Sequence, residues 1–262
     1  MSEFYWYLQD CDLFSYLNNF EIRQLENVSK TRTFRRGEPI YLPDEIADGV
    51  LLVAKGRVKI CHVTPDGKQS ILSFIDSGEL FGELSLFDTT ARQEFAEAIE
   101  SSTIVLIPKS AMLKLMSHHP NMCVGITKLI GDRRQRIERR LRNLLFRSNR
   151  ERVVHLLIEM AEKYGQPSDD GINLAIKLSH QEMASTIGST RETVTVMLGQ
   201  LQSEGSIRIA RRRITITNLE KLSNEVNESY EKVNDRMHKA QQPKRSQPHT
   251  IEQFTIRKNP LS

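Results

Sequence analysis

The spacing of hydrophobic and polar positions changes near residue 108, which divides the chain into two parts. Before this point, short runs of β-branched and other apolar residues are separated by glycine-containing turn signals. In VKICHV, Val58 and Ile60 share one face of an extended segment, and Lys59 and Cys61 share the other. Several such strands predict a β sandwich or barrel. The preceding residues 12–29 space their leucines as a small helical cap would.

After residue 108 the apolar spacing lengthens to that of helices. It predicts a short helix to about Ser117 and, after Pro120, a long helix to about Phe146. The long helix carries a narrow apolar stripe made of Ile126, Ile130, Ile137, Leu141 and Leu144. Such a stripe is suited to pairing with a second helix, and a parallel homodimer is the simplest partner. Arg133 interrupts the stripe, within a basic stretch that is either a solvated face or a functional one.

The segment after the long helix contains residues that typically begin and end helices. Ser148 and Glu151 have the spacing of a capping box, which opens an amphipathic helix that ends at Gly165. INLAIKL, residues 172–178, then has the composition of a strand. At the far end of the chain, residues 221–240 could continue as a polar helix. From residue 241 the Gln, Pro and Ser content predicts disorder.

Two further capping-box spacings predict a helix-turn-helix. Ser179-x-x-Glu182 opens a helix that ends at Gly188, and Ser189-x-x-Glu192 opens the next helix directly afterwards. The following segment, SIRIARRRITIT, alternates isoleucine with polar residues on both sides of an arginine-rich turn. This pattern predicts a β wing with a basic tip.

Composition limits the class of protein. A chain of 262 residues with 39% hydrophobic content favours two domains plus tails, and its apolar runs are too short to span a bilayer. Because the start lacks the features of a secretory signal, we expect a cytoplasmic protein without membrane association. Three scattered cysteines without C-x-x-C spacing indicate no disulfide framework, zinc site or iron–sulfur cluster. Without a nucleophile–base or metal-ligand constellation, we expect no enzyme, no catalytic residues and no metal site.

Two motifs accompany the order of β domain, long helix and winged helix. FGELSL followed by an arginine is similar to the phosphate-binding cassette of the CRP/FNR superfamily of bacterial transcription regulators. IGSTRETVTVMLGQL resembles the recognition helix of that family. LSHQEMASTIGSTRETVT is especially similar to the cyanobacterial global nitrogen regulators within it. The resemblance covers roughly residues 10–220.

This resemblance implies an α+β fold with an N-terminal cyclic-nucleotide-binding-like β jelly roll, a long dimerisation helix and a C-terminal winged helix-turn-helix. The implied domains are the cap helix and effector-binding β domain at 1–120, the dimerisation helix at 121–147, the DNA-binding domain at 148–220, and the polar helix and disordered tail at 221–262. The implied function is a sequence-specific transcription regulator that binds an inverted-repeat promoter site as a homodimer. Its implied partners are double-stranded DNA and RNA polymerase.

The first turns of a recognition helix carry the side chains that read bases in the major groove. Arg191 could donate two hydrogen bonds to guanine, and Glu192 could accept one from a cytosine amino group. Many family members carry an arginine where this chain has Val196, which offers only apolar contact, for example with a thymine methyl group. As the third residue of a capping box, Glu192 could instead bond back to the Ser189 amide.

Because the net charge is only +4, a DNA-binding surface must come from local clustering. Short hydrogen-bonding side chains near the helix-turn-helix and the arginines of the wing are suited to phosphates. These candidate phosphate contacts are Ser179, Gln181, Thr190, Thr193, Arg211, Arg212 and Arg213.

A glycine-containing turn in FGELSL could hold an anion. Gly82, Glu83 and Leu84 can present backbone amides as a small nest that faces Arg92. In relatives that bind cyclic nucleotides, residues at the positions of Arg92 and Glu83 meet the cyclic phosphate and a ribose hydroxyl. The resemblance therefore implies cyclic AMP or another cyclic nucleotide as a candidate effector. An internal ion pair of Arg92 with Glu83 or Glu94 is the alternative.

Three positions depart from the cyclic-nucleotide pattern, and the chain also fits a second candidate effector. Gln93 stands where those relatives have Ser or Thr, and Ile137 and Glu138 stand where a polar pair meets the adenine. The nitrogen regulators bind 2-oxoglutarate with the same turn and arginine, and with an arginine and a glutamate five residues apart on the long helix. Arg133 and Glu138 have that spacing. Those regulators, however, usually lack a glutamate at the position of Glu83.

Other functions stay open at this point. A regulator that binds DNA constitutively, without an effector, would carry the same motifs as one that needs an effector. A cyclic-nucleotide-sensing module of an enzyme, kinase or channel would lack the helix-turn-helix. An architectural DNA-binding protein would tolerate any sequence, whereas a specific regulator loses roughly 10³-fold or more in affinity when its site is scrambled.

Overall fold

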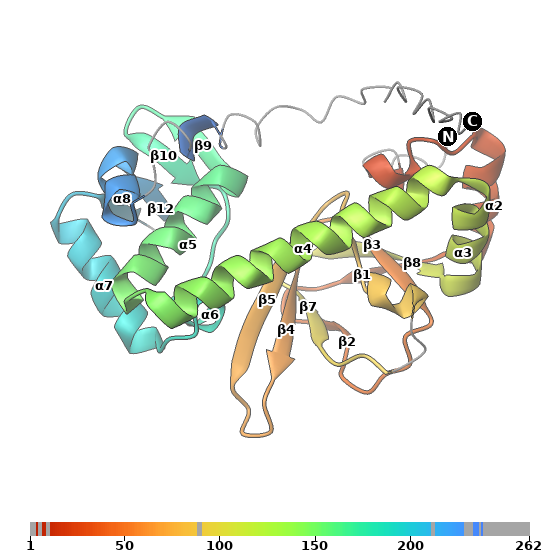
Figure 1. The fold of residues 1–262 in the computed structure, drawn as a ribbon, viewed down its shortest axis with the longest axis horizontal. Coiled ribbons are helices and arrows are strands. Elements are labelled where there is room, and N and C mark those ends of the chain that lie inside the picture. Colours follow the sequence, from red (N-terminus) through yellow and green to blue (C-terminus); the bar gives the residue numbers. More distant parts are fainter. Residues whose placement is uncertain are drawn as a thin grey trace, which may run out of the picture.

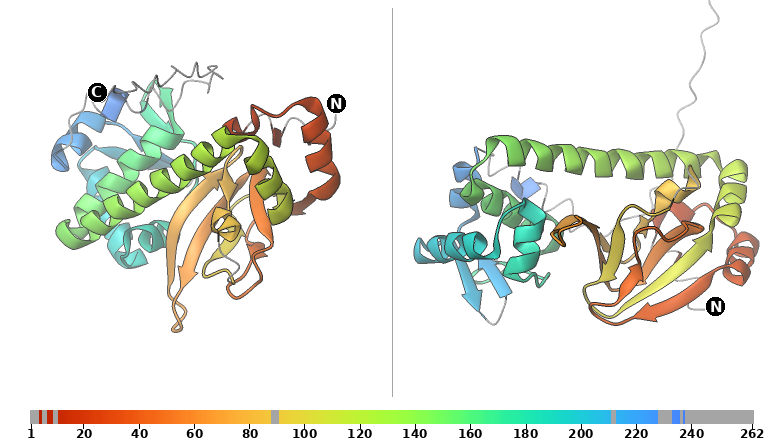
Figure 2. Two further views of the ribbon diagram at one scale, coloured as in Figure 1. Left: turned by 45° about the vertical axis from the view of Figure 1, so that its right-hand side comes forward. Right: turned by 90° about the horizontal axis from the view of Figure 1, so that it is seen from below.

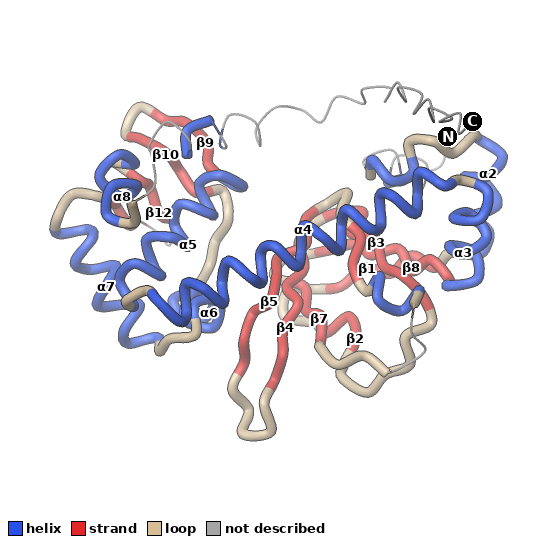
Figure 3. Tube along the Cα trace, in the orientation of Figure 1, coloured by secondary structure: helices blue, strands red, loops and turns tan. Residues whose placement is uncertain are grey.

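The computed structural model describes residues 4, 7, 8, 11–87, 91–210, 213–227, 233–235 and 237. These residues form a β sandwich, one long helix and a mostly helical domain, in that chain order (Figure 1). Strands are concentrated in the N-terminal half, and helices dominate the remainder (Figure 3). The predicted disorder from residue 241 lies outside the described residues. In the described part of the chain, no helix combines the length and apolarity needed to cross a membrane.

The sandwich consists of two four-stranded antiparallel sheets, with strand orders β1-β8-β3-β6 and β2-β7-β4-β5. The strands are β1 (Lys30–Phe34), β2 (Pro39–Tyr41), β3 (Gly49–Lys55), β4 (Arg57–Val63), β5 (Gln69–Asp76), β6 (Leu80–Phe81), β7 (Phe95–Ala98) and β8 (Ser102–Pro108). Phe34, Val53, Val58 and Phe81 belong to the core formed by side chains of both sheets. The predicted α+β class with an N-terminal β domain is confirmed.

Strand β3 is buried on both faces, which explains its nearly continuous apolar sequence. Leu51 and Val53 point into the core between the sheets, whereas Val50 and Leu52 pack beneath a helical layer. The elements of this layer are η1 (Asp12–Phe14), α2 (Asn19–Val28), α3 (Lys109–His118) and the first part of α4 (Pro120–Phe146). The helical cap that the leucine spacing predicts is therefore present, as a single 3₁₀ turn followed by α2.

Helix α4 extends along both parts of the molecule (Figure 2). Its first turns pack on the sandwich, where Ile126 is fully buried and Ile130 is partly buried. Its later turns leave Ile137, Leu141 and Leu144 about half exposed. The predicted dimer stripe thus has two different environments. Ile126 belongs to the core of its own subunit, and only the three later residues present an apolar surface.

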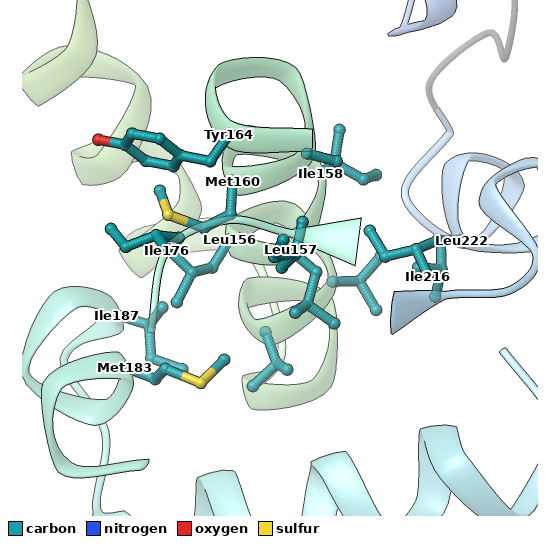
Figure 4. Packing of buried hydrophobic residues seen from close by; sticks show 14 of the residues in the cluster. Leu156, Leu157, Ile158, Met160, Tyr164, Ile176, Met183, Ile187, Ile216 and Leu222 are labelled. Atoms are coloured by element: carbon teal, nitrogen blue, oxygen red, sulfur yellow. The ribbon is translucent and has the colours of Figure 1, made fainter. Parts of the chain in front are cut away.

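The C-terminal domain is a winged helix-turn-helix. Its helices are α5 (Asn149–Tyr164), α6 (His180–Ile187), α7 (Arg191–Ser203) and α8 (Leu219–Glu225). Its sheet has the order β11-β12-β10-β9 and consists of β9 (Gly165–Ser168), β10 (Gly171–Leu174), β11 (Ile207–Ala210) and β12 (Arg213–Ile216). Leu157, Met183, Ile216 and Leu222 pack together in its core (Figure 4).

The predicted capping boxes at Ser148 and Ser179 are both present. The predicted strand at residues 172–178 is shorter in the structure, since β10 ends at Leu174. The sequence pattern also missed β9, whose residues GQPS include a glycine and a proline that lower strand propensity.

The outer face of the β4–β5 sheet packs against the winged helix-turn-helix domain. The alternation predicted in β4 holds, since Val58 and Ile60 face the sandwich core while Cys61 faces the other domain. Cys61 and Phe74 share one apolar cluster with Leu157 of α5 and the other core residues of the winged helix. Burial raises the pKa of the Cys61 thiol to about 12, so it stays neutral in this contact.

Ion pairs reinforce this contact between the two domains. Asp76, at the end of β5, pairs with Lys163 and accepts a 2.9 Å hydrogen bond from the Tyr164 hydroxyl. It also pairs with Arg57, whose guanidinium lies 4.4 Å from the Tyr164 ring centroid. Burial raises the pKa of Asp76, but the charges and hydrogen bonds of Lys163 and Arg57 outweigh this effect and the net pKa is lowered.

Replacing Asp76 with asparagine is expected to weaken this contact. At pH 7 we expect a loss on the order of 1–3 kcal/mol in the free energy of unfolding, because the charged partners lose the negative charge and one of the two acceptor oxygens that they face. Since the folded state lowers the pKa of Asp76, its contribution is fully present above about pH 4 and is lost as the pH falls through the folded-state pKa. Thermal unfolding of parent and Asp76→Asn between pH 3 and 7 measures both effects. A variant as stable as the parent at pH 7 would contradict the assignment, and Asp169→Asn, in an exposed turn, is the control.

Candidate DNA-binding surface and anion cassette

The turn of the helix-turn-helix is fixed by a glycine in the left-handed region. Gly188 has φ 64° and ψ 47°, and its N–H donates to the Ala184 carbonyl at the end of α6. A Cβ at this position would lie 2.8 Å from Leu144 Cδ2 of the long helix. Glycine therefore permits both the backbone conformation and the close approach of α4.

The recognition helix α7 begins one residue later than its predicted capping box. Thr190 is the N-cap, and its Oγ1 accepts from the Thr193 amide at 3.2 Å. Ser189 lies before the cap and donates instead to Asn149 Oδ1 at 3.2 Å. The capping role considered for Glu192 is therefore wrong, because Glu192 is the second residue of the helix and Thr193 is the third.

One face of α7 is buried and the opposite face is exposed. Val194, Leu198 and Leu201 pack into the domain core. Arg191, Glu192 and Val196, the predicted base contacts, are exposed. No hydrogen bond or ion pair joins the Arg191 or Glu192 side chain to another residue that the structure describes. One side of α7 is thus held in the core and the other side is free, and the helix lies at the edge of the domain (Figure 1).

Sequence reasoning missed two residues of this face. Thr195 is exposed one turn after Arg191, and its hydroxyl lies 2.8 Å from Nδ1 of His180 at the start of α6. The contact ties the two helices together at their exposed edge. The helical spacing of four residues from Arg191 could have indicated Thr195, whereas nothing in the sequence signals the partner histidine.

The predicted phosphate contacts that the structure describes lie at the starts of α6, α7 and β12. Ser179 caps α6 and accepts from the Glu182 amide, and its hydroxyl donates to the Glu182 carboxylate at 2.8 Å. Gln181 and Thr190 are exposed, and Thr193 is half-buried with its hydroxyl 3.0 Å from that of Thr190. In the wing, the exposed Arg213 begins β12. Arg211 and Arg212 lie outside the described residues.

The cassette, which we define as Gly82, the 3₁₀ helix η2 (Glu83–Leu86) and Arg92, lies at the end of β6 against α4. Gly82 has φ 69°, and a Cβ there would lie 2.5 Å from Arg92 Nη1. The guanidinium of Arg92 therefore lies directly against the glycine. Glu83 and Arg92 are almost completely buried, at 4% and 8% exposure, whereas Leu84 is exposed.

The buried charges of the cassette have partners within the chain. Arg92 Nη2 donates to the Gly49 carbonyl at 3.1 Å, and its guanidinium lies 4.1 Å from the Tyr41 ring centroid. Glu83 pairs with Arg133 of α4, which also donates to the Leu80 carbonyl. The structure thus joins Glu83 to Arg133 rather than to Arg92.

Glu138 is not part of this cluster in its own subunit. It pairs at 2.8 Å with Arg134, and its side chain is 52% exposed. With 3.6 residues per turn, a spacing of five places Arg133 and Glu138 about 140° apart around the helix. The structure therefore brings together Gly82, Glu83, Arg92 and Arg133. No group of three or more His, Cys, Asp or Glu side chains in the described part of the chain is arranged to hold a metal ion.

Comparison with known families gives two matches that follow the structural division. Residues 31–119, from the sandwich to the end of α3, match the cyclic nucleotide-binding domain. Residues 151–225, from α5 to the end of α8, match the Crp-like helix-turn-helix domain. The second match includes α8, which packs on α5 and buries Leu222.

Whole-chain relatives combine the same two parts. The chain is 33% identical over 187 residues to a global nitrogen regulator of Synechococcus elongatus, covering 71% of this chain and 84% of the relative. It is 27% identical over 190 residues to a CRP-like cAMP-activated global transcriptional regulator of Mycobacterium tuberculosis, covering 72% of this chain and 85% of the relative.

Solved structures show the same fold. FixK2 from Bradyrhizobium japonicum is similar with a TM-score of 0.67 at 26% identity, covering 75% of this chain and 96% of that one. A transcriptional regulator of the CRP/FNR family from Thermus thermophilus gives a TM-score of 0.63 at 26% identity, covering 76% of this chain and 98% of that one.

Replacing Thr190 with valine keeps the branched shape but removes the oxygen that caps α7. We expect the protein to lose about 1 kcal/mol of stability, the usual cost of an N-cap. Thr190→Ser keeps the oxygen and should unfold like the parent. Urea unfolding without DNA measures the three proteins, and an unchanged midpoint for Thr190→Val would show that this cap contributes nothing.

Proposed function

The chain belongs to the CRP/FNR family of transcription regulators, and from this premise we propose that the exposed face of α7 reads an inverted repeat in DNA. Regulators of this family bind DNA through the helix-turn-helix and act as dimers, and they are not enzymes. The observation that carries the proposal is the free face of α7, where Arg191 and Glu192 project from a helix whose other face is buried.

Direct reading of bases follows from the chemistry of this face. Arg191 matches the O6 and N7 acceptors of guanine, and Glu192 matches the amino donor of cytosine. Val196 offers apolar contact to a thymine methyl group, and Thr195 adds a hydroxyl to the same exposed surface. We therefore propose a half-site that contains G·C pairs.

Phosphate contacts would fix the register of α7 on the duplex. Ser179 and Gln181 lie at the N-terminus of α6, on the exposed side of the turn. Thr190 and Thr193 lie on the same side, at the start of α7. The wing would add Arg211, Arg212 and Arg213 on the neighbouring backbone. These side chains position the protein without selecting bases.

Dimerisation is the role that we propose for the later turns of α4. Ile137, Leu141 and Leu144 form an exposed stripe with the three- and four-residue spacing of a helix pair. Pairing of two such helices would cover this apolar surface and bring two recognition helices to one side. On an inverted repeat these would lie about one helical turn of DNA apart, roughly 34–36 Å.

The cassette is suited to a small anionic effector, and we propose either a cyclic nucleotide or 2-oxoglutarate. The match to the cyclic nucleotide-binding domain and the presence of a buried Glu83 and a buried Arg92 in the cassette favour a cyclic nucleotide. Arg133 next to the cassette supplies a second cation, which favours a dicarboxylate. Either ligand would compete for the contacts that Arg92 and Glu83 make within the chain.

An effector-independent regulator is the second candidate function, and one observation favours it. Both buried charges of the cassette already have partners, namely the Gly49 carbonyl for Arg92 and the Arg133 guanidinium for Glu83. A cassette filled in this way is stable without a ligand. It could fix α4 in a single arrangement that binds DNA.

Coupling between cassette and DNA would pass through α4. Arg133 contacts the cassette, and Leu144, three turns later, contacts the helix-turn-helix turn at Gly188. A ligand that binds better to one arrangement of the helix pair shifts the population toward it by its difference in affinity. RNA polymerase is the further partner that we propose for the DNA-bound dimer, on the basis of the family's role in transcription.

Selection of binding sites from random duplexes tests the base contacts. We expect Arg191→Ala to cost on the order of 1–3 kcal/mol and to flatten the preference at one position of each half-site. Arg212→Ala, in the arginine run of the sequence between β11 and β12, should weaken all sequences alike and reduce the salt dependence. If Arg191→Ala and the parent select identical sequences, the assignment of Arg191 is refuted.

Calorimetric titration with cyclic AMP, cyclic GMP and 2-oxoglutarate identifies the effector. We expect one of the three to bind the parent, and we expect Arg92→Ala to lose this binding because the anion loses its buried guanidinium. Arg23→Ala, on the exposed surface of α2, is the matched control and should bind like the parent. If none of the three ligands gives a heat of binding, the effector-independent regulator is supported instead.

A further inference from the structure

We propose that a pocket between α4, α5 and α6 is a second anion-binding site, which takes a phosphate-bearing small molecule. The pocket has a volume of about 50 Å³ and opens to solvent on one side. Since one water needs roughly 10–15 Å³ by the same measure, the pocket has room for a few waters or one phosphate group. The rest of a larger ligand could extend through the open side.

The pocket carries excess positive charge. Four arginines line it against two glutamates, Glu159 and Glu162. Of the four, Arg140 has partners within the chain. It donates to the Ile71 and Leu72 carbonyls, at 3.0 and 2.6 Å, and lies 3.6 Å from the Glu159 carboxylate.

Two of the other arginines lack such partners. Arg136 and Arg139 line the pocket from α4, and neither makes an ion pair with a residue that the structure describes. Clustered like charges around a partly enclosed space repel one another, and an anion between them removes that repulsion. Arginine guanidinium groups also match phosphate with paired hydrogen bonds.

Arg152 adds a fixed donor at the edge of the pocket. Its Nη1 donates to the Ile187 carbonyl at 3.0 Å, and its Nη2 donates to Asn149 Oδ1 at 2.8 Å. Its Nε is buried and has no hydrogen-bond partner among the described residues. A buried donor without a partner is costly, and because this Nε is shielded from solvent, the Arg152 side chain would have to turn toward the pocket before an anion could accept from it.

The position of the pocket gives such a ligand a consequence for the fold. Its walls come from the long helix, from α5 and from the end of α6, where Arg152 holds the last carbonyl before Gly188. A bound anion would therefore join α4 to the turn that precedes the recognition helix. This site shares no residue with the cassette, so binding here would not depend on the effector proposed above.

Calorimetric titration of the full-length protein with inorganic pyrophosphate tests the site, with potassium chloride of equal ionic strength in both solutions. We expect pyrophosphate to bind the parent, to bind Arg92→Ala equally well, and to raise the Tm of both. The double variant Arg136→Gln with Arg139→Gln should bind about tenfold or more weakly, which corresponds to about 1.4 kcal/mol. Arg142→Gln, on the exposed side of α4 outside the pocket, is the matched control and should bind like the parent.

A second variant tests the pocket while keeping every arginine. Asn143 lines the pocket from α4, and Asn143→Glu places a carboxylate among the guanidinium groups. We expect this variant to be folded and to lose pyrophosphate binding. The proposal is overturned if the double variant or Asn143→Glu binds as tightly as the parent. It is equally overturned if Arg142→Gln weakens binding as much as the double variant does, or if only Arg92→Ala abolishes it.

Discussion

The ion pair between Glu83 and Arg133 joins the cassette to the long helix that also reaches the helix-turn-helix domain. Glu83 is almost completely buried, so its carboxylate needs a partner, and the structure supplies one from the long helix. The same helix reaches Gly188 through Leu144. A ligand that binds the Glu83 carboxylate must change the contacts of Arg133. The long helix is therefore placed to carry a change in the cassette to the helix-turn-helix, in the range of roughly 1–3 kcal/mol typical of coupled sites.

A second constraint holds the DNA-binding domain against the sandwich. Asp76 gathers Arg57, Lys163 and the Tyr164 hydroxyl at the end of β5, next to an apolar contact that includes Cys61. Charged groups that are buried together cost desolvation, and they define one orientation of the two domains more sharply than apolar packing does in some proteins. We infer that the domain position is set jointly by this contact and by α4. A change of state would have to reorganise both.

Local signals in the sequence were sufficient for most elements and for the exposed face of α7. Ser148 and Ser179 cap helices as predicted, because each is followed three residues later by a glutamate that completes a capping box. The same spacing at Ser189 predicted the wrong N-cap residue for α7. Thr190, next to it, also has a suitable partner in Thr193, and only the folded turn decides which of the two residues is the cap. The change of hydrophobic spacing near residue 108 separated the two parts of the chain, and the family resemblance added the jelly-roll architecture.

Contacts between distant segments could not be predicted in this way. The alternation in β4 showed two faces, but nothing in it indicated that the face with Cys61 packs against another domain. The apolar stripe of α4 looked uniform, yet Ile126 is buried in its own subunit and Leu141 is exposed. The sequence suggested Arg92 as the partner of Glu83, whereas the fold pairs Glu83 with Arg133 of the long helix. Each of these outcomes depends on which surfaces the fold brings together.

The most direct test of this account is the affinity of the full-length protein for a duplex that carries its selected inverted repeat, compared with one in which a single half-site is scrambled, with stoichiometry measured by sedimentation. The account predicts two chains per intact duplex and a loss of roughly 10³-fold or more on scrambling, because the second recognition helix loses its base contacts. One chain per duplex, or equal affinity for the two duplexes, would contradict it.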